Sequence, residues 1–444
     1  MMMHSARDSG IFLSGFDAVA GDQDLIRVLG KHDAANAWRE SILKYSWSCR
    51  NNFIVGICFK QWMRLVWKFK HCIDWKEYSF RVGFVSCLSI INSCLSTIEF
   101  IIFGNKIRQT IQEVSRNSDK EHPVFILGHP RSGTTLLHNL ISFDSDQFYI
   151  CNTFCAGFPS SFLWFESIGK VLLSRLIDTK RPMDNMKLSF ELPQEDEIAT
   201  SVMSGGISPY FCLPFMRNHE DFHDFFSFNS STTSKESRET WTQSFLELYS
   251  KLKLRSQRNA SAQTSCLPGS NEKKRALLKS PVHTSRIQLL LQMFPNAQFI
   301  YIHRNPYEVY ASAKHMAVTT YPYVYLSVPT EETVDEFIFK QYEILWNDYF
   351  RDREMILSSN KRALIEISYS ELCHDPMSSI SKIYEYFGWN PWSPEFRTKL
   401  EDIVCTELRS YKKNEFQTHP REISDEISRR WNDSILQLGY EFCS

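Results

Sequence analysis

The 444-residue sequence lacks an excess of charge of either sign. Lys and Arg number 50 and Asp and Glu number 51, which leaves a formal net charge of −1. Proteins that bind nucleic acid without sequence preference carry a basic excess, because contacts of Lys and Arg with phosphates drive that binding. The composition therefore excludes this class of function, and no nucleic-acid partner is expected.

The twelve cysteines lack a C-x-x-C pair, the spacing typical of structural zinc sites. The chain is also far longer than the small secreted domains that disulfide bonds hold together. Neither a zinc site nor a disulfide scaffold is therefore expected. Hydrophobic residues make up 43% and charged residues 23% of the chain, which is enough apolar material for an ordinary globular core.

The sequence also lacks an uninterrupted apolar run of membrane-spanning length. Residues 82–103 come closest, but Glu99 interrupts them, and an unpaired carboxylate is costly inside a bilayer. A buried or interfacial helix is expected, with a true span as the alternative. Residues 59–70 mix tryptophan with Lys and Arg, which is typical of a helix on an anionic membrane surface and equally of a helix packed on the main domain. Membrane contact through residues 53–103 is thus an open possibility, and the location is left open between Golgi-type membrane association and the cytoplasm.

The chain divides at a polar break over residues 117–122. Residues 1–118 have helical patterns without catalytic spacing and are predicted to form a helical N-terminal region. Residues 119–444 are predicted to form the main domain. Ser, Thr, Asn and Lys are frequent around residues 225–274, which indicates surface loops inserted into that domain, with a helix between them over residues 241–252.

Short apolar runs in the main domain alternate with helical patterns. The runs cover residues 124–127, 276–278 and 299–302, and residues 364–367 are predicted to form a fourth strand. Fully apolar runs of this length suit strands that are buried on both faces of a parallel sheet. The alternation predicts a three-layer α/β fold in which helices flank a parallel sheet. Thr284 or Ser285 is expected to cap the helix after the second run, and Pro306 to open the helix after the third.

Two glycines five residues apart follow the first run. The pattern is that of a Walker A loop, but Thr134 stands where a kinase or ATPase has Lys, and Arg131 supplies the positive charge instead. Backbone N–H groups of such a loop and of the following helix start bind anions. The sequence therefore predicts a phosphate-binding loop with these members: Gly128, His129, Pro130, Arg131, Ser132, Gly133, Thr134 and Thr135.

The segment FILGHPRSGTTLLHNL resembles the 5′-phosphosulfate loop of sulfotransferases that use 3′-phosphoadenosine-5′-phosphosulfate (PAPS), in the branch that carries PRSGTT. Arg304 and Ser312 match the spacing of the family's second element, which binds the 3′-phosphate of the nucleotide. The resemblance implies a P-loop-type fold, PAPS as co-substrate, no metal, and in-line transfer of a sulfuryl group to a hydroxyl or amine. It also implies that a late basic pair, Lys412 and Lys413, closes over the 3′-phosphate.

The resemblance leaves the catalytic base open. His283 resembles the His of a Lys-to-His element that supplies the base in several sulfotransferases, although the spacing here is K-S-P-V-H rather than K-x-H. Other branches use a glutamate, for which Glu195 and Glu197 are the candidates. Lys279 is expected either to contact the bridging oxygen of the donor or to pair with a carboxylate.

Two other functions fit parts of the pattern. A P-loop kinase or NTPase would need Lys at position 134 and carboxylates for Mg²⁺. A catalytically inactive nucleotide-binding scaffold would bind the nucleotide without turnover. The acceptor is left open among small molecules, glycans and lipids, because acceptor pockets are built from variable loops, and no oligomeric state is predicted.

Overall fold

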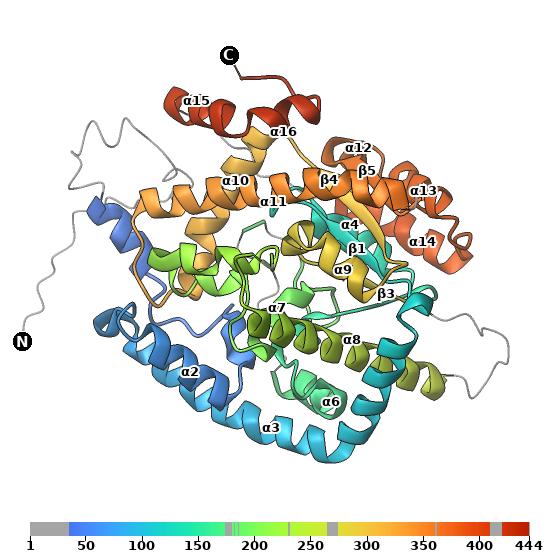
Figure 1. The fold of residues 1–444 in the computed structure, drawn as a ribbon, viewed down its shortest axis with the longest axis horizontal. Coiled ribbons are helices and arrows are strands. Elements are labelled where there is room, and N and C mark those ends of the chain that lie inside the picture. The colour runs from blue at the N-terminus through green and yellow to red at the C-terminus, as the bar shows by residue number, and fades with distance from the viewer. Residues whose placement is uncertain are drawn as a thin grey trace, which may run out of the picture.

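A parallel β-sheet forms the centre of the molecule (Figure 1). The structure, a computed structural model, describes residues 35–173, 180–181, 183–184, 186–229, 231–263, 274–359, 362–408 and 420–443. Within these residues five strands pair in the order β2-β3-β1-β4-β5, all parallel. Their bounds are β1 (Val124–Leu127), β2 (Phe148–Ile150), β3 (Arg275–Lys279), β4 (Gln298–His303) and β5 (Leu364–Ser368).

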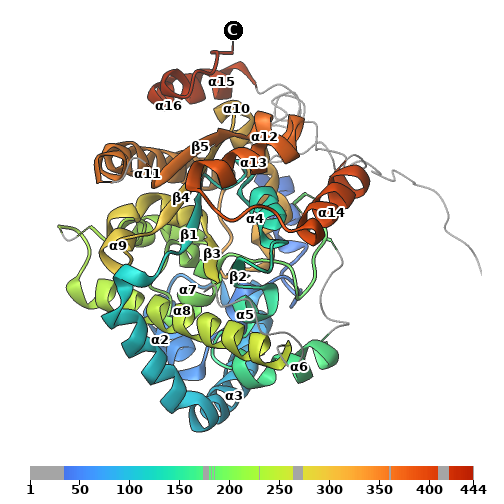
Figure 2. The same cartoon turned by 90° about the vertical axis from the view of Figure 1, so that its right-hand side faces the viewer.

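Helices cover both faces of the sheet, because alternate side chains of each strand point to opposite sides. Val124 and Ile126 of β1 belong to one hydrophobic cluster, whereas Phe125 and Leu127 belong to another. The first cluster includes α4 (Thr134–Ser142), α12 (Tyr369–His374), α13 (Pro376–Phe387) and α14 (Pro394–Ile403). The second includes α8 (Lys235–Gln263), α9 (Ile287–Met293) and α11 (Glu331–Ser359). Figure 2 shows the layers edge-on, and the predicted three-layer α/β fold is confirmed.

The remaining helices surround this sandwich. They are α2 (Phe59–Phe69), α3 (Trp75–Arg116), α5 (Thr153–Gly157), α6 (Phe162–Leu173), α7 (Asp196–Met203), α10 (Pro306–Thr319), α15 (Arg421–Arg430) and α16 (Asn432–Gln437). Short 3₁₀ segments are η1 (Phe53–Gly56), η2 (Ser118–Lys120), η3 (Pro209–Cys212), η4 (Met216–Phe225), η5 (Pro281–Ser285) and η6 (Tyr321–Tyr323), and η7 (Val404–Leu408) is a π-helical turn. The described part of the N-terminal region is helical, as predicted, and shares the hydrophobic core of the sheet.

The long apolar helix α3 packs against α8 around one buried ion pair. In the part of the chain that the structure describes, α3 alone is long and apolar enough to cross a membrane, and 22% of its most apolar window is buried. Glu99 points inward, pairs with Lys251 of α8, and accepts a hydrogen bond from the Leu163 N–H at 2.8 Å. Both charged side chains are at most 3% exposed. The negative charge of Glu99, which interrupts the apolar residues 82–103, is therefore balanced by the positive charge of Lys251 inside the protein.

The helix predicted over residues 241–252 is present but longer than predicted. α8 runs 29 residues, so the loops predicted on either side are wrong for residues 235–240 and 253–263. Trp241, Phe245 and Leu252 repeat on one buried face of this helix, where Lys251 is also buried and pairs with Glu99. Its last turns are stabilised by Arg255, which donates two hydrogen bonds to Glu166.

Two local predictions near β3 and β4 have different outcomes. Pro306 opens α10, and Asn305 caps it by accepting a hydrogen bond from the Tyr307 N–H. The expected cap at Thr284 or Ser285 is wrong, since both residues lie in η5 and α9 begins at Ile287. The Thr284 hydroxyl instead accepts a hydrogen bond from the Gly128 N–H at 2.9 Å and so ties η5 to the loop after β1.

Candidate active site

The turn between β1 and α4 depends on two glycines. Gly128 has φ of +142° and Gly133 has φ of +100°, in a region that residues with side chains rarely adopt. A Cβ at Gly128 would lie 2.4 Å from the carbonyl oxygen of Ile302, and a Cβ at Gly133 would lie 2.4 Å from the ring of Tyr369. Conformation and space therefore both require glycine at these positions.

Polar contacts inside the loop fix its shape. The Ser132 hydroxyl donates to the carbonyl oxygen of His129 at 2.8 Å. Burial lowers the pKa of His129 to about 3, so its imidazole is neutral and serves as a packing group. Among the described residues no side chain caps α4, whose first residues Thr134 and Thr135 line a pocket. A helix start of this kind, with its N–H groups and positive dipole end, favours an anion.

The pocket lies where the loop after β1 meets the element after β4. Its volume is about 260 Å³. It brings Arg131, Arg304 and Ser312 to one place, although the first and last are 181 residues apart in the chain. The full lining is Arg131, Gly133, Thr134, Thr135, Leu136, Asp184, Met186, Arg304, Ser312, Tyr369, Leu372, Cys373, Pro376 and Leu408.

Arg131 spans the pocket wall between two partners. Its Nε donates to the Ser312 hydroxyl at 3.0 Å, and its Nη1 donates to the Asp184 carboxylate at 3.1 Å. The backbone of Arg131 has φ of +74°, which is unusual for a residue with a side chain. Such conformations concentrate at functional sites, and here this one lies in the anion-binding loop.

Arg304 is held at the end of β4 on the neighbouring side of the pocket. Its Nε and Nη2 donate to Glu308 at 2.8 and 2.6 Å, and its Nη1 donates to the Arg131 carbonyl oxygen at 3.2 Å. The guanidinium lies 4.6 Å from the ring centre of Tyr369, a cation–π distance. Arg131 and Arg304 are therefore linked directly, and each presents a planar donor group to the same cavity.

Behind the loop, Lys279 and Glu195 form an ion pair. Lys279 Nζ lies 2.8 Å from Glu195 Oε1 and donates to the pocket-lining Thr135 hydroxyl at 3.2 Å. Glu195 also accepts a hydrogen bond from the Tyr210 hydroxyl. Burial raises the pKa of Glu195, but the charge and hydrogen bond of Lys279 outweigh it and hold the pKa below its ordinary value. The Glu195 side chain is 21% exposed, so an ionised carboxylate stands next to the pocket.

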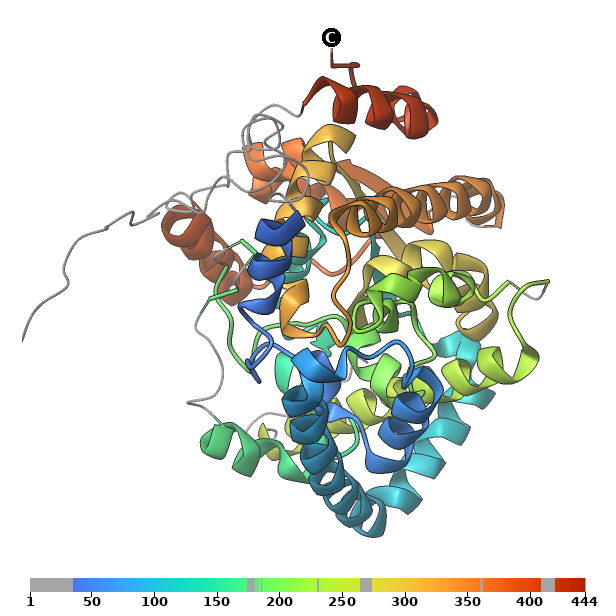
Figure 3. The same cartoon turned by 90° about the vertical axis from the view of Figure 1, so that its left-hand side faces the viewer.

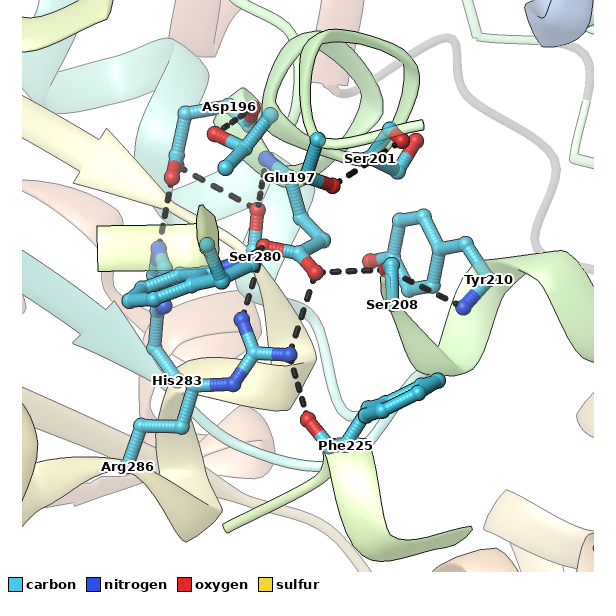
Figure 4. A network of polar contacts seen from close by, with 12 residues as sticks. Asp196, Glu197, Ser201, Ser208, Tyr210, Phe225, Ser280, His283 and Arg286 are labelled. Atoms are coloured by element: carbon cyan, nitrogen blue, oxygen red, sulfur yellow. Dashed lines mark hydrogen bonds and ion pairs between the residues drawn. The ribbon is translucent and has the colours of Figure 1, made fainter. Parts of the chain in front are cut away.

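The two carboxylates after Glu195, Asp196 and Glu197, point toward His283 and Arg286 in the interior (Figure 4). Asp196 Oδ2 lies 2.6 Å from His283 Nε2, and both side chains are fully buried. The His283 ring packs edge-on against Phe125 and Phe245, and its Nδ1 has no hydrogen-bond partner among the described residues. His283 is therefore enclosed in the core and does not line the pocket.

Glu197 forms a second buried ion pair, with Arg286. Arg286 Nη1 and Nη2 donate to Glu197 at 2.7 and 3.1 Å, with both side chains 0% exposed. The remaining guanidinium N–H groups donate to the carbonyl oxygens of residues 225 and 226, and the group lies between the rings of Phe228 and Trp241. These contacts anchor the first turn of α7, and with it the preceding Glu195.

A model of the sulfotransferase family matches residues 123–394, which contain the loop, both arginines, Lys279 and the three carboxylates. The chain belongs to the sulfotransferase family. It is therefore an enzyme that transfers a sulfuryl group to an acceptor. This assignment decides against the kinase or NTPase alternative, in agreement with Thr134 at the Walker lysine position.

Relatives of this sulfotransferase cover nearly its whole length. The omega-hydroxy-beta-dihydromenaquinone-9 sulfotransferase Stf3 of Mycobacterium bovis and of Mycobacterium tuberculosis is 29% identical over 395 residues, which are 87% of this chain and 91% of the relative. Two crystal structures show the same fold at low identity. The sulfotransferase STF9 of Mycobacterium avium has a TM-score of 0.54 at 13% identity and covers 97% and 99% of the two chains. STF1 of Mycobacterium tuberculosis has a TM-score of 0.52 at 14% identity and covers 94% and 99%.

The structure groups some of the predicted site residues of the sulfotransferase and separates others. Four of the eight predicted loop residues line the pocket together with Arg304 and Ser312: Arg131, Gly133, Thr134 and Thr135. Lys279 with Glu195 lies directly behind it. His283 and Glu197 are enclosed in the interior instead. Lys412 and Lys413 lie outside the described residues.

Two residues that contact the pocket arginines, Asp184 and Tyr369, were not among the predicted site residues of the sulfotransferase. Asp184 orients Arg131, and Tyr369 packs on both Gly133 and the Arg304 guanidinium. Tyr369 directly follows β5, at the carboxyl end of a parallel strand, where ligands bind in open α/β sheets. That position was an available signal for Tyr369. Asp184 lies far from any strand end in the chain, so the sheet gives no such signal for it.

Proposed function

We propose that PAPS is the sulfate donor, and that the pocket of Arg131, Arg304 and Ser312 binds it. The convergence of two arginines, a serine hydroxyl and an anion-binding loop on one cavity carries this proposal. A donor with a 5′-phosphosulfate and a 3′-phosphate needs two anion sites close together, and guanidinium groups offer paired donors to phosphate. The catalytic unit we propose comprises residues 119–444, against which the helical residues of 1–118 pack.

The loop residues and Arg131 are proposed to bind the 5′-phosphosulfate, and Arg304 with Ser312 the 3′-phosphate. In the transfer, the bond between sulfur and the bridging oxygen breaks, and a bond between sulfur and the acceptor oxygen forms. Negative charge collects on the sulfuryl and bridging oxygens, which cationic and N–H donors stabilise. Arg131 and the N–H groups at the start of α4 supply those donors, and Lys279 adds a positive charge behind Thr135.

Glu195 is proposed as the base that accepts the proton of the acceptor hydroxyl. It is ionised and partly exposed, and two hydrogen bonds through Lys279 connect it to the pocket-lining Thr135. His283 was the other candidate, and its complete burial against Asp196 supports a structural role instead. A general base must come within hydrogen-bond distance of the proton it removes, which favours the partly exposed group.

For the acceptor we propose a hydroxyl on an apolar, lipid-like small molecule. The named relative acts on an omega-hydroxy-dihydromenaquinone and covers most of this chain, which supports the class. Leu136, Met186 and Leu372 give the pocket an apolar part beside the charged groups. The experiment that follows compares acceptors of this class with glycans and polar small molecules.

The donor assignment is tested with ³⁵S-labelled PAPS and purified protein. Label is expected to move to hydroxylated lipid-like acceptors in the presence of EDTA, because no step requires a metal ion. Adenosine 3′,5′-bisphosphate is expected to inhibit competitively with PAPS. Hydrolysis of ATP that depends on Mg²⁺, together with an absence of label transfer, would overturn the proposal, whereas label only on glycans would change the acceptor class and leave the donor in place.

The pH dependence of the rate distinguishes the two candidate bases. Because the pKa of Glu195 lies below its ordinary value of 4.5, the rate should stay constant on acidification until the pH falls below 4.5. A histidine base would instead give a decline near pH 6.5. Glu195→Gln is expected to lower kcat by about 10²–10⁴-fold.

Acid unfolding must be separated from loss of the base in this experiment. A carboxylate with a lowered pKa stabilises the fold above its unfolded-state pKa, and that contribution is lost as pH falls through the folded pKa. Circular dichroism at each pH therefore accompanies the rates. A decline near pH 6.5 in folded protein, unchanged in Glu195→Gln, would assign the base to a histidine.

A further inference from the structure

The helices α2, α3 and α6 lie at the pole of the molecule opposite α15 and α16 (Figure 3). Many apolar side chains of these three helices are exposed. The central part of this exposed apolar surface is a stripe on α3 formed by Ile90, Ile91, Ile98, Phe100, Ile101 and Ile102, which are 38–75% exposed. We call the exposed sides of these three helices the apolar face. Exposed apolar surface of this extent marks a contact with another molecule or a membrane.

The apolar face is one continuous surface because α2 and α6 are fixed to α3. The Phe59 N–H donates to the Ser93 hydroxyl and the Trp62 indole donates to the Ser86 hydroxyl, which places α2 alongside α3 in the opposite direction. On the other side, the Trp164 indole of α6 donates to the Leu95 carbonyl oxygen at 3.0 Å. α6 then adds three exposed aliphatic side chains to the face: Ile168, Val171 and Leu172.

Positive charge borders the apolar face on the α2 side. Phe59, Met63 and Trp67 form an exposed apolar row at intervals of four residues, and the residues directly after each of them are Lys60, Arg64 and Lys68. Lys70 adds a further cation, with its Nζ 3.9 Å from the Trp67 ring centre. α2 thus presents an apolar row and a cationic row side by side on its exposed surface.

Exposed carboxylates are absent from α2 and from the stripe on α3. Residues 59–73 and 80–106, all of which the structure describes, contain one carboxylate, and this is the buried Glu99 that pairs with Lys251. The one carboxylate of α6, Glu166, is 15% exposed and pairs with Lys170 and Arg255. At the end of the stripe Lys106 and Arg108 are exposed. On the α6 side, the exposed Arg258 lines a cavity of about 290 Å³ together with Ile102. The apolar face is therefore bordered by cations on several sides.

We propose that the apolar face binds the surface of an anionic lipid bilayer. Aliphatic and aromatic side chains enter the boundary between headgroups and acyl chains, and the bordering lysines and arginines contact acidic headgroups, as on interfacial amphipathic helices. The stripe on α3 is roughly 20 Å long at 1.5 Å per residue, and the helix lies parallel to the surface over this length. Glu99, Lys251 and the packing of α8 keep its inner side in the protein.

In this orientation α3 does not cross the membrane, because a helix that is packed along α8 cannot be surrounded by lipid. The proposed binding also differs from self-association, because a second copy would bring a like-charged cationic border against the first. Charge complementarity therefore favours an acidic lipid surface over a second copy of the chain as the partner of the apolar face. The proposal does not depend on which donor or acceptor the enzyme uses.

Flotation of the full-length chain with lipid vesicles tests the proposal. The protein is expected to float with phosphatidylcholine vesicles that contain phosphatidylserine, to bind less at high salt, and to bind pure phosphatidylcholine more weakly. The triple variant Lys60→Gln, Arg64→Gln, Lys68→Gln should lose affinity on the order of 100-fold, because each cation near an anionic surface contributes about 1 kcal/mol. Ile101→Asp should lose about tenfold or more, since it places a carboxylate in the apolar stripe.

The matched control is Leu436→Asp on α16, where an equally exposed apolar residue lies at the opposite pole. This variant should float like the wild type, and all variants should keep the wild-type circular dichroism spectrum. Equal flotation of wild type with both vesicle types would overturn the proposal. The proposal would also be overturned if the wild type failed to float and instead formed a dimer, detected by analytical ultracentrifugation, that Ile101→Asp converts to a monomer.

Discussion

Replacing Arg131 with alanine is expected to lower kcat by about 10³-fold while the protein stays folded. The guanidinium is the one cation that belongs to the anion-binding loop itself, and it extends from the loop to Ser312 across the pocket wall. Its removal leaves Asp184 with a second partner, because Arg181 Nε lies 3.5 Å from that carboxylate. The loss should therefore fall on charge stabilisation in the transition state rather than on the fold.

Arg304→Ala provides the comparison for Arg131→Ala. Arg304 belongs to the element proposed to bind the 3′-phosphate, so its loss should mainly raise the Kd for adenosine 3′,5′-bisphosphate, measured by calorimetry. At saturating donor the rate of Arg304→Ala should stay well above that of Arg131→Ala. Equal losses of donor affinity in both variants, with unchanged rates at saturation, would contradict the division of roles. Arg131→Lys should recover part of the rate, since lysine keeps the charge without the paired donors.

Arg286→Met is expected to lower the free energy of unfolding by about 3–5 kcal/mol, the cost of leaving a buried partner charge uncompensated. The Glu197 carboxylate would then lack its guanidinium partner at a position where both side chains are fully buried. Urea denaturation monitored by circular dichroism measures this loss. Because Glu197 lies two residues after Glu195, the folded fraction of the variant should also have a lower kcat.

A double variant separates the ion pair from simple loss of packing. Arg286→Met combined with Glu197→Gln removes the uncompensated charge, so it should be more stable than Arg286→Met alone. Arg397→Met is the matched surface control, since Arg397 is 65% exposed and pairs weakly with Glu401, and its stability should be nearly unchanged. A double variant no more stable than the single one would show that the pair does not account for the loss.

The strands of the sheet were predictable because they are buried on both faces. The apolar run of residues 124–127 corresponds to β1, and residues 364–367, which Glu366 interrupts, correspond closely to β5. The strand β2 was missed, since its three residues lie at the edge of the sheet and pair on one side with β3. Its apolar run of three residues is too short to be distinguished from a turn by periodicity alone.

The candidate site was predictable where it is local in the chain. The loop of residues 128–135 is one continuous segment, and Arg304 and Ser312 lie on a strand end and the helix that follows it. The pairing of Lys279 with Glu195 spans 84 residues and depends on how α7 packs beside β3. The direction of His283 depends on η5, whose tight turn points the ring inward. Neither the pairing of Lys279 with Glu195 nor the direction of the His283 ring can be predicted from the spacing of residues in the sequence alone.

Three successive carboxylates at the start of α7 have three different partners: Lys279, His283 and Arg286. A substitution there alters one contact, whereas inserting or deleting one residue would rotate the following side chains by about 100° relative to those before it. Natural variation among homologous chains should therefore include exchanges of residue type across this segment but not changes in its length. In this segment, the number of residues is therefore under a stronger evolutionary constraint than the identity of each residue.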